Sequence, residues 1–307
     1  MTLFGVALPQ SGASGPTLPE DTASFVRDAE RYGLHSLWVQ EQTIGADPSL
    51  EPLVNLAYVA ALTSTIRLGT AAVIAPARNP VVLAKQLASL DRLSRGRLIV
   101  GLAIGDMLSL YEASGVPVEG RGDRLDDLVR VLKGFWTEPR FDHESVYRSI
   151  VDSPMEPKPL QRPHPPLWFG GKSAAALARA VREGQGWVSA GGTSIARFGE
   201  LVPSVRQAIQ GREDDFTIAK KVYIAVEDDG ESARRRLAEW FAVHWITGEN
   251  PEELAATVGV SGTPQECADA LAALAELGPD LIILNPVYDE RDQLARLAET
   301  VLPALRS

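Results

Sequence analysis

Two glycine-containing turns stand where an apolar segment gives way to a helical pattern. The first is Gly170-Gly171-Lys172-Ser173. Glycines let backbone N–H groups approach a ligand closely, and a helix that begins there directs the positive end of its dipole to the same place. Ser173 could cap that helix or donate a hydrogen bond to a phosphate. A plain strand-to-helix turn explains the same residues, so these four alone leave both interpretations open.

The second turn, Gly191-Gly192-Thr193, repeats the arrangement farther along the chain. Gly191 could supply the other side of an anion site. Glycine pairs are common in ordinary turns, which is the stronger explanation for this segment taken alone.

A carboxylate, Asp106, follows the apolar segment Leu98 to Leu102. It could act as a general acid or a polar anchor, although a solvated loop carboxylate fits the pattern as well. The four histidines form no HExxH or similar ligand spacing, so a catalytic metal site is disfavoured. The chain has no GxSxG elbow and no P-loop, which leaves hydrolase and phosphoryl-transfer chemistry without support.

These residues lie in a repeated pattern of apolar strands and amphipathic helices. Continuous apolar strands that alternate with helices are typical of a parallel sheet covered on its outer face, and eight such units favour a closed (β/α)8 TIM barrel. The predicted strands are Leu3 to Leu8, Ser36 to Gln40, Arg67 to Val73, Leu98 to Leu102, Leu167 to Phe169, Gly186 to Val188, Thr217 to Val226 and Leu281 to Leu284. Trp168 and Trp187 lie on strands and are expected in the core.

Two stretches break the pattern. The segment from Phe141 to Pro166 contains six prolines and predicts an insertion between strands four and five, with short extended pieces around Val146-Tyr147 and Met155. The stretch from Thr247 to Val260 has the character of a mobile loop. Both are candidates for defining substrate specificity.

The composition limits the classes of partner. The chain has 307 residues, of which 45% are hydrophobic, and its net charge is −10. A nucleic-acid or membrane-surface role is disfavoured because both need a basic face. No stretch reaches the ~18 apolar residues of a membrane span, and the N-terminus lacks a basic leader, so a cytoplasmic location is expected. The single cysteine, Cys267, is expected to be a small buried hydrophobe.

Taken together, several segments resemble the luciferase-like monooxygenase family, which includes bacterial luciferase and the deazaflavin (coenzyme F420) dependent oxidoreductases. The likeness covers nearly the whole chain in order, and residues 1–307 are expected to form one luciferase-like domain. The segments are Tyr32 to Val39, Ile66 to Thr70, Arg78 to Gln86, Leu90 to Leu98, Arg121 to Leu125, Pro165 to Gly171, Ser261 to Pro264 and Leu281 to Leu284.

The resemblance implies where a cofactor would lie. Its ring would rest at the barrel mouth against Ala71 and Ala72, where relatives often carry a bulge with a non-proline cis peptide. Ile104, at the end of the fourth strand, would also contact the cofactor. The resemblance further implies that Gly170 and Gly171 hold the cofactor phosphate, and we add Ser173 and Gly191 to that site.

One departure from the family pattern bears on the chemistry. Relatives commonly place an acidic residue and a catalytic histidine after the second strand, whereas this chain has Glu41-Gln42. Gln42 can hydrogen-bond but cannot shuttle a proton at neutral pH. The candidate catalytic residues are therefore Asp106, Gln42 and Glu41. A sugar-phosphate dehydrogenase, in some of which Asp106 has an acidic counterpart, is put in doubt.

The expected cofactor is F420, because hydride transfer requires mainly alignment, whereas oxygen chemistry in this family often recruits the missing histidine. Arg78 and Lys172 would lie near the mouth and could meet the anionic tail of the deazaflavin. FMN is the alternative, in a two-component monooxygenase with a separate flavin reductase. A homodimer acting on a small organic substrate is expected.

Two further hypotheses remain open. The chain could be a cofactor-binding barrel with little catalysis, since the usual histidine is missing. It could also be an unrelated metal-free barrel, such as an isomerase or aldolase. That last class would need a buried lysine at a strand end, and Lys172 is the nearest candidate in the sequence.

Overall fold

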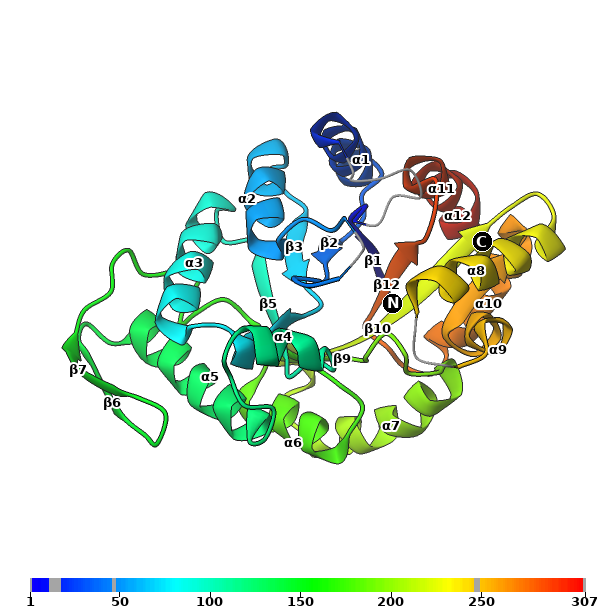
Figure 1. Cartoon of the computed structure of the whole chain (residues 1–307). Coiled ribbons are helices and arrows are strands. Elements are labelled where there is room, and N and C mark those ends of the chain that lie inside the picture. The colour runs from blue at the N-terminus through cyan, green and yellow to red at the C-terminus, as the bar shows by residue number, and fades with distance from the viewer. Residues whose placement is uncertain (1, 11–17, 46–47, 246–248, 306–307) are drawn as a thin grey trace.

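The computed structural model describes residues 2–10, 18–45, 48–245 and 249–305. Eight parallel strands close into a barrel with helices around it, so the predicted (β/α)8 TIM barrel is confirmed (Figure 1). The barrel strands are β1 (Leu3–Ala7), β2 (Ser36–Val39), β3 (Arg67–Thr70) with its continuation β4 (Val73–Ile74), β5 (Leu98–Ala103), β8 (Leu167–Gly170), β9 (Gly186–Val188), β10 (Thr217–Val226) and β12 (Leu281–Pro286).

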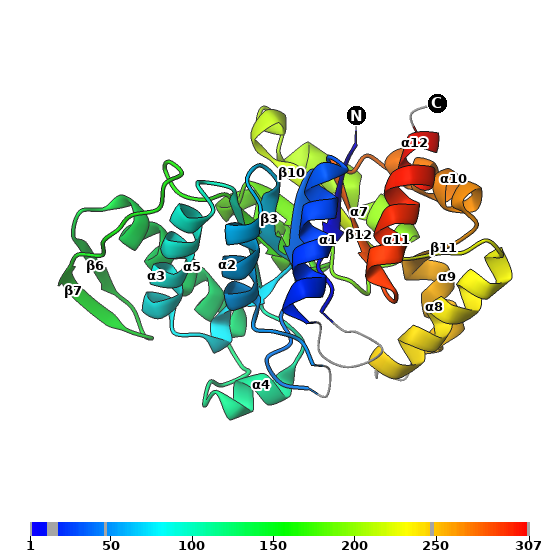
Figure 2. The same cartoon turned by 90° about the horizontal axis from the view of Figure 1, so that it is seen from above.

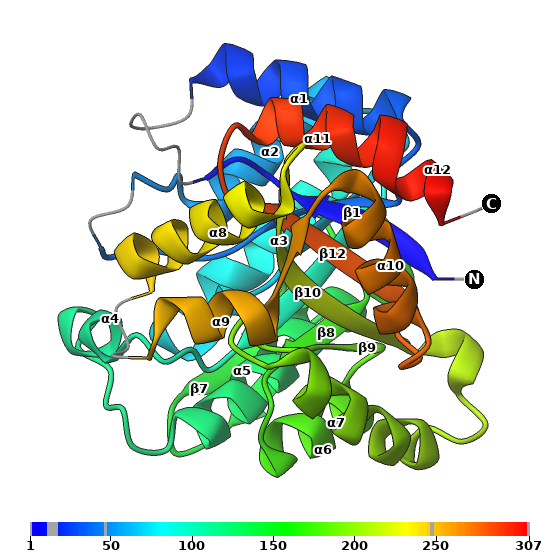
Figure 3. The same ribbon diagram turned by 90° about the vertical axis from the view of Figure 1, so that its right-hand side faces the viewer.

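Strand β10 has three parallel neighbours. Its first residues pair with β9, which closes the barrel, and its middle pairs with β12. Its last residues, from Tyr223 onward, pair with β11 (Gly259–Gly262). Figure 3 shows β1, β12 and β10 side by side, with α8 (Gly230–His244) and α9 (Pro251–Val258) near the carboxyl end of β10.

Helices cover the outside of the barrel. Several begin with proline in the first turn, a position that tolerates the missing N–H group. The helices are α1 (Pro19–Arg31), α2 (Pro52–Leu62), α3 (Pro80–Leu93), α5 (Arg121–Thr137), α6 (Ala174–Glu183), α7 (Ile195–Ala208), α10 (Pro264–Ala275) and α11 (Glu290–Arg296), which continues through a π-helical turn (Leu297–Val301) into α12 (Leu302–Ala304). Two 3-10 turns, η1 (Ala75–Ala77) and η2 (Glu213–Asp215), complete the set.

Large aromatic side chains fill the base of the barrel. Trp38 and Trp168 pack inside it with ring centroids 5.1 Å apart. Trp187 is fully buried and stacks on Phe198 of α7, on the outer side of the wall. Both predicted core tryptophans are confirmed. Cys267 is also buried, and burial raises the pKa of its thiol to about 12, as expected for an inert side chain.

The insertion lies where it was predicted, between α5 and β8, but its extended pieces were misplaced. The hairpin strands are β6 (Phe141–Glu144) and β7 (Ser149–Ser153), and Val146-Tyr147 forms the turn between them. Met155 lies after β7, outside any strand. Asp127 of α5 binds His143 and Arg148, each at 2.7 Å, on either side of the turn. This tertiary anchor, which local sequence does not reveal, sets where the strands form.

The stretch from Thr247 to Val260 is also more regular than predicted. Helix α9 begins at Pro251 after an Asn250 cap that accepts a hydrogen bond from Glu252 N, and β11 follows it directly. Residues 246–248 lie outside the described residues. The short helix α4 (Leu108–Ala113) lies beyond the carboxyl ends of the strands, at the lower edge of Figure 2. In a (β/α)8 barrel, sites are built at that end, the mouth.

Candidate active site

Small residues from three neighbouring strand ends form one wall of the mouth. A cis peptide bond joins Ala71 and Ala72 between β3 and β4, which confirms the expected irregularity. A Cβ atom added to Gly170 would lie 3.3 Å from the Ala103 Cβ and 3.6 Å from the Ala72 Cβ. All four residues are partly exposed. This surface of methyl groups and backbone, which we call the alanine wall, could accept the face of a flat ring.

Buried hydrogen bonds fix the position of the alanine wall. The Thr70 hydroxyl donates to Gly101 O at 2.7 Å and accepts from Gly101 N at 2.8 Å, which ties the end of β3 to β5. The carboxylate of Glu41 accepts a hydrogen bond from Ile74 N at 2.6 Å, just after the wall. The segment with the cis peptide is therefore held by hydrogen bonds on both sides.

The Glu41 side chain is almost fully buried, and its carboxylate is fully engaged. It also accepts hydrogen bonds from Thr43 Oγ1 at 2.7 Å and from Arg78 Nη2 at 2.8 Å. Arg78 Nη1 pairs in turn with Glu51 at 2.8 Å. Two carboxylates thus hold the Arg78 guanidinium, and its contact with a cofactor tail stays a prediction. Gln42 is partly exposed, and its amide lies against Gly45.

The Gly170-Gly171 turn leads directly into the start of α6. Gly171 has a φ of +142°, a conformation that side chains rarely adopt, and Trp187 Nε1 donates to its carbonyl at 2.8 Å. Ser173 is the N-cap of α6, and its Oγ accepts a hydrogen bond from Ala176 N at 3.2 Å. Its hydroxyl hydrogen stays available, so the turn could still bind an anion.

Gly191 lies at the neighbouring strand end, before α7. A Cβ atom there would lie 2.8 Å from the Tyr223 hydroxyl, and one on Gly192 would lie 2.9 Å from the Trp245 ring. Ring packing therefore accounts for glycine at both positions. Ser194 caps α7, so two helix N-termini start from adjacent strands. An anion between them would meet both dipoles.

Asp106 is exposed at the end of β5 and faces β10 across the mouth. Burial raises the pKa of the Tyr223 phenol, and the Asp106 carboxylate raises it further, which places these two groups near each other. The buried Tyr111 of α4 donates to Ile104 O and so anchors the segment that carries Asp106. Ile104 is partly exposed beside it.

Two polar residues of the mouth, Lys221 and Tyr223 on β10, were not predicted from the sequence. Lys172 is exposed, so it was the wrong candidate for a buried lysine at a strand end. Lys220 and Lys221 are the buried lysines. Two adjacent lysines inside the otherwise apolar segment Thr217–Val226 were the available signal.

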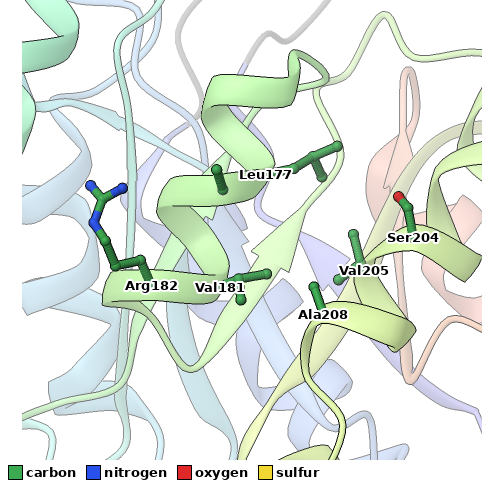
Figure 4. Close-up of a pocket in the computed structure, with 7 residues that line it drawn as sticks. Leu177, Val181, Arg182, Ser204, Val205 and Ala208 are labelled. Carbon is green, nitrogen blue, oxygen red and sulfur yellow. The ribbon is translucent and has the colours of Figure 1, made fainter.

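Two grooves lie outside the mouth, and the larger, of about 410 Å³, is lined by residues that include Arg67, Trp168 and Arg212 near the amino ends of the strands. Among the described residues, no cluster of three or more His, Cys, Asp or Glu side chains could hold a metal ion. A groove of about 320 Å³ lies between α6 and α7, lined by Leu177, Val181 and Val205 (Figure 4). This groove is mainly apolar and lies outside the barrel, away from the strand ends. The described part of the chain also contains no helix long and apolar enough to cross a membrane.

Residues 1–281 match the family model of the luciferase-like monooxygenases. The chain belongs to this family. Family members are flavin- or F420-dependent oxidoreductases and monooxygenases, so the expected class of enzyme is confirmed.

Relatives of both cofactor types are similar to the chain. It is 28% identical over 295 residues to an FMNH2-dependent dimethylsulfone monooxygenase of Pseudomonas putida, covering 85% of this chain and 80% of that protein. It is 29% identical over 322 residues to an F420-dependent glucose-6-phosphate dehydrogenase of Kineococcus radiotolerans, covering 94% of each. The crystal structure of monooxygenase RslO1 from Streptomyces bottropensis superposes with a TM-score of 0.85 at 22% identity, covering 98% of this chain and 99% of that one, which supports the fold.

Proposed function

We propose that the chain is an F420-dependent oxidoreductase that transfers hydride between the deazaflavin and a small organic substrate. The choice of F420 over FMN rests on the residues that line the mouth. It combines a wall of small side chains with Gln42, an amide, at the place where relatives commonly carry a catalytic histidine. Such a site aligns two reactants well but offers little proton transfer, which suits hydride transfer.

The residues of the mouth divide into three roles in this proposal. The alanine wall and Ile104 support the ring of the cofactor, while Gly170, Gly171, Ser173 and Gly191 receive its phosphate between the starts of α6 and α7. Bound there, F420 would supply a ring carbon that accepts or donates hydride in place of the N5 atom of a flavin.

Asp106 and Glu41 serve different purposes. Asp106, which follows Ala103 of the alanine wall at the end of β5, orients the substrate within electrostatic range of Tyr223. Glu41 positions the alanine wall through Ile74 N and Arg78, and does not exchange protons with the substrate. The only proton-exchanging group among the three predicted catalytic residues is then Asp106.

An FMN-dependent monooxygenase is the second candidate, favoured by the similarity to the FMNH2-dependent relative. It would require a separate flavin reductase as a partner. A cofactor-binding barrel with little catalysis is the alternative from another class.

Turnover separates these candidates. The purified protein is mixed with F420 and a panel of alcohols, aldehydes and hydroxy acids, and reduction is followed by loss of the deazaflavin's visible absorbance. In parallel, the protein receives FMN, a flavin reductase, oxygen and the same panel. We expect substrate-dependent turnover with F420. Turnover confined to the FMN arm would contradict the proposal, and cofactor binding without turnover in either arm would favour the binding barrel.

A further inference from the structure

A lysine side chain crosses the interior of the barrel. Lys221 Nζ on β10 donates a hydrogen bond to Gln40 Oε1, just beyond β2. Strands β1 and β12 separate β2 from β10 around the barrel, so this bond passes through the lumen. The ammonium lies 5.0 Å from the centroid of the Tyr223 ring. Lys221 is therefore at the floor of the mouth, above the tryptophan-filled base.

The Lys221 ammonium has no carboxylate counter-ion among the residues that the structure describes. Its side chain is buried, and among the described residues no carboxylate forms an ion pair with it. Burial lowers its pKa to about 8, so it remains mostly protonated at neutral pH. A buried cation without an anionic partner is costly, and proteins retain such groups mainly at functional sites.

The side-chain amide of Gln40 is also held in a position where it could donate to an anion. Gln10 fixes the backbone of Gln40 through two hydrogen bonds, of 2.8 Å to Gln40 N and 3.0 Å to Gln40 O. Because Gln40 presents Oε1 to Lys221, its Nε2 group is left without an acceptor among the described residues. The spare N–H groups of Lys221 and Gln40 therefore lie side by side at the mouth, with no acceptor for them among the described residues.

The preceding residue, Lys220, differs from Lys221 in the direction of its side chain. It is equally buried but lies on the other face of β10, where Nζ donates to Thr193 O at 2.6 Å and lies 6.0 Å from the Phe198 ring centroid. Lys220 packs between the barrel and α7 and does not reach the lumen.

The position of Lys221 relative to the alanine wall identifies its ligand. Strand β10 is four strands away from β3 in either direction around the barrel, so it lies opposite the wall. A ring resting on the wall, as in the proposed function on which this inference rests, leaves the substrate between the ring and β10. We propose that Lys221 and Gln40 bind a carboxylate or similar oxyanion of the substrate, which makes the substrate an organic acid.

The test uses acetate as the anionic probe and acetamide as its neutral isostere. The full-length protein is saturated with the cofactor it binds, so that the phosphate turn is occupied, and its thermal midpoint is measured at constant ionic strength. The parent's midpoint should rise by about 2 °C at a tenfold excess of acetate over its dissociation constant. Acetamide should produce no shift.

Two variants assign the effect to a residue. Lys221→Met should abolish the acetate shift and also raise the midpoint above the parent's, because it removes an uncompensated buried charge. A structural ion-pairing lysine would lower it instead. Lys220→Met is the matched control, since it removes an equally buried lysine one residue away and should keep the acetate shift.

The inference is overturned if the parent shows no acetate shift, or if Lys221→Met keeps it. Loss of the acetate shift in both variants would also overturn it, because the effect would then depend on the combined positive charge of the two lysines and not on Lys221 itself. Failure to bind F420 or FMN would instead refute the proposed function. The acetate comparison between the two variants could still be made on the cofactor-free protein, so the two failures are distinguishable.

Discussion

Replacing Gly170 with valine tests the alanine wall without straining the backbone. The new Cβ atom would lie 3.3 Å from the Ala103 Cβ, a tight contact that requires a shift of only a few tenths of an ångström. The two methyl groups beyond it would occupy space that we assign to the cofactor ring. Overpacking of this kind costs about 1–3 kcal/mol, which corresponds to a dissociation constant roughly 5- to 150-fold weaker.

The assay is a fluorescence titration of parent and variant with F420. Gly170→Ala should fall between the parent and Gly170→Val. Gly199→Ala is the control, because its Cβ atom would meet Leu277 at a similar 3.2 Å on the outside of the barrel. Thermal midpoints within a few degrees of the parent would show that the fold is intact.

A Gly170→Val protein that binds F420 as tightly as the parent would refute the wall as the ring site. Gly171→Val is a poorer test of the adjacent turn. At its φ of +142° a side chain is strained, and its Cβ atom would lie 2.6 Å from the Ala176 Cβ. Loss of binding in that variant could follow from local misfolding alone.

Three further predictions concern catalysis, assembly and acid stability. Asp106→Asn should lower turnover about 10-fold or more with F420 affinity retained, and unchanged turnover on an identified substrate would remove Asp106 from the mechanism. A homodimer that buries the exposed apolar side chains Val54, Tyr58 and Val82 of α2 and α3 is predicted, so Val82→Lys should give a monomer by light scattering, and a monomeric parent would contradict this. Burial alone would raise the pKa of Glu30, but the backbone N–H groups of residues 64–66 lower it to about 2 from 4.5. Glu30 therefore stabilises the fold above pH 4.5 and loses this effect as the pH falls through about 2. The decrease in thermal midpoint caused by Glu30→Gln should be largest at neutral pH and should diminish as the pH falls from 4.5 to about 2. A decrease that does not depend on pH would refute the assignment.

Elements with a strong local pattern were predictable from the sequence. The segment from Thr217 to Val226 was predicted with the bounds that β10 has, because its apolar run is continuous apart from two lysines. The hairpin of the insertion was not, because β6 reads Phe-Asp-His-Glu and its strand depends on contacts between α5 and the hairpin.

Side-chain direction was the main information that the sequence could not supply for the site. Lys220 and Lys221 are adjacent in sequence, yet one faces α7 and the other the lumen. Arg78 was expected at the mouth, and only the structure reveals that Glu41 and Glu51 bind it. The cis peptide at Ala71-Ala72, by contrast, was predicted from family resemblance together with two small residues at a strand end.

Equilibrium titration decides between F420 and FMN as the cofactor. The purified protein is titrated side by side with F420 and FMN, each in oxidised and reduced form. The proposed function predicts the tighter dissociation constant for F420 in at least one redox state. Tight FMN binding with no measurable affinity for the deazaflavin would contradict it.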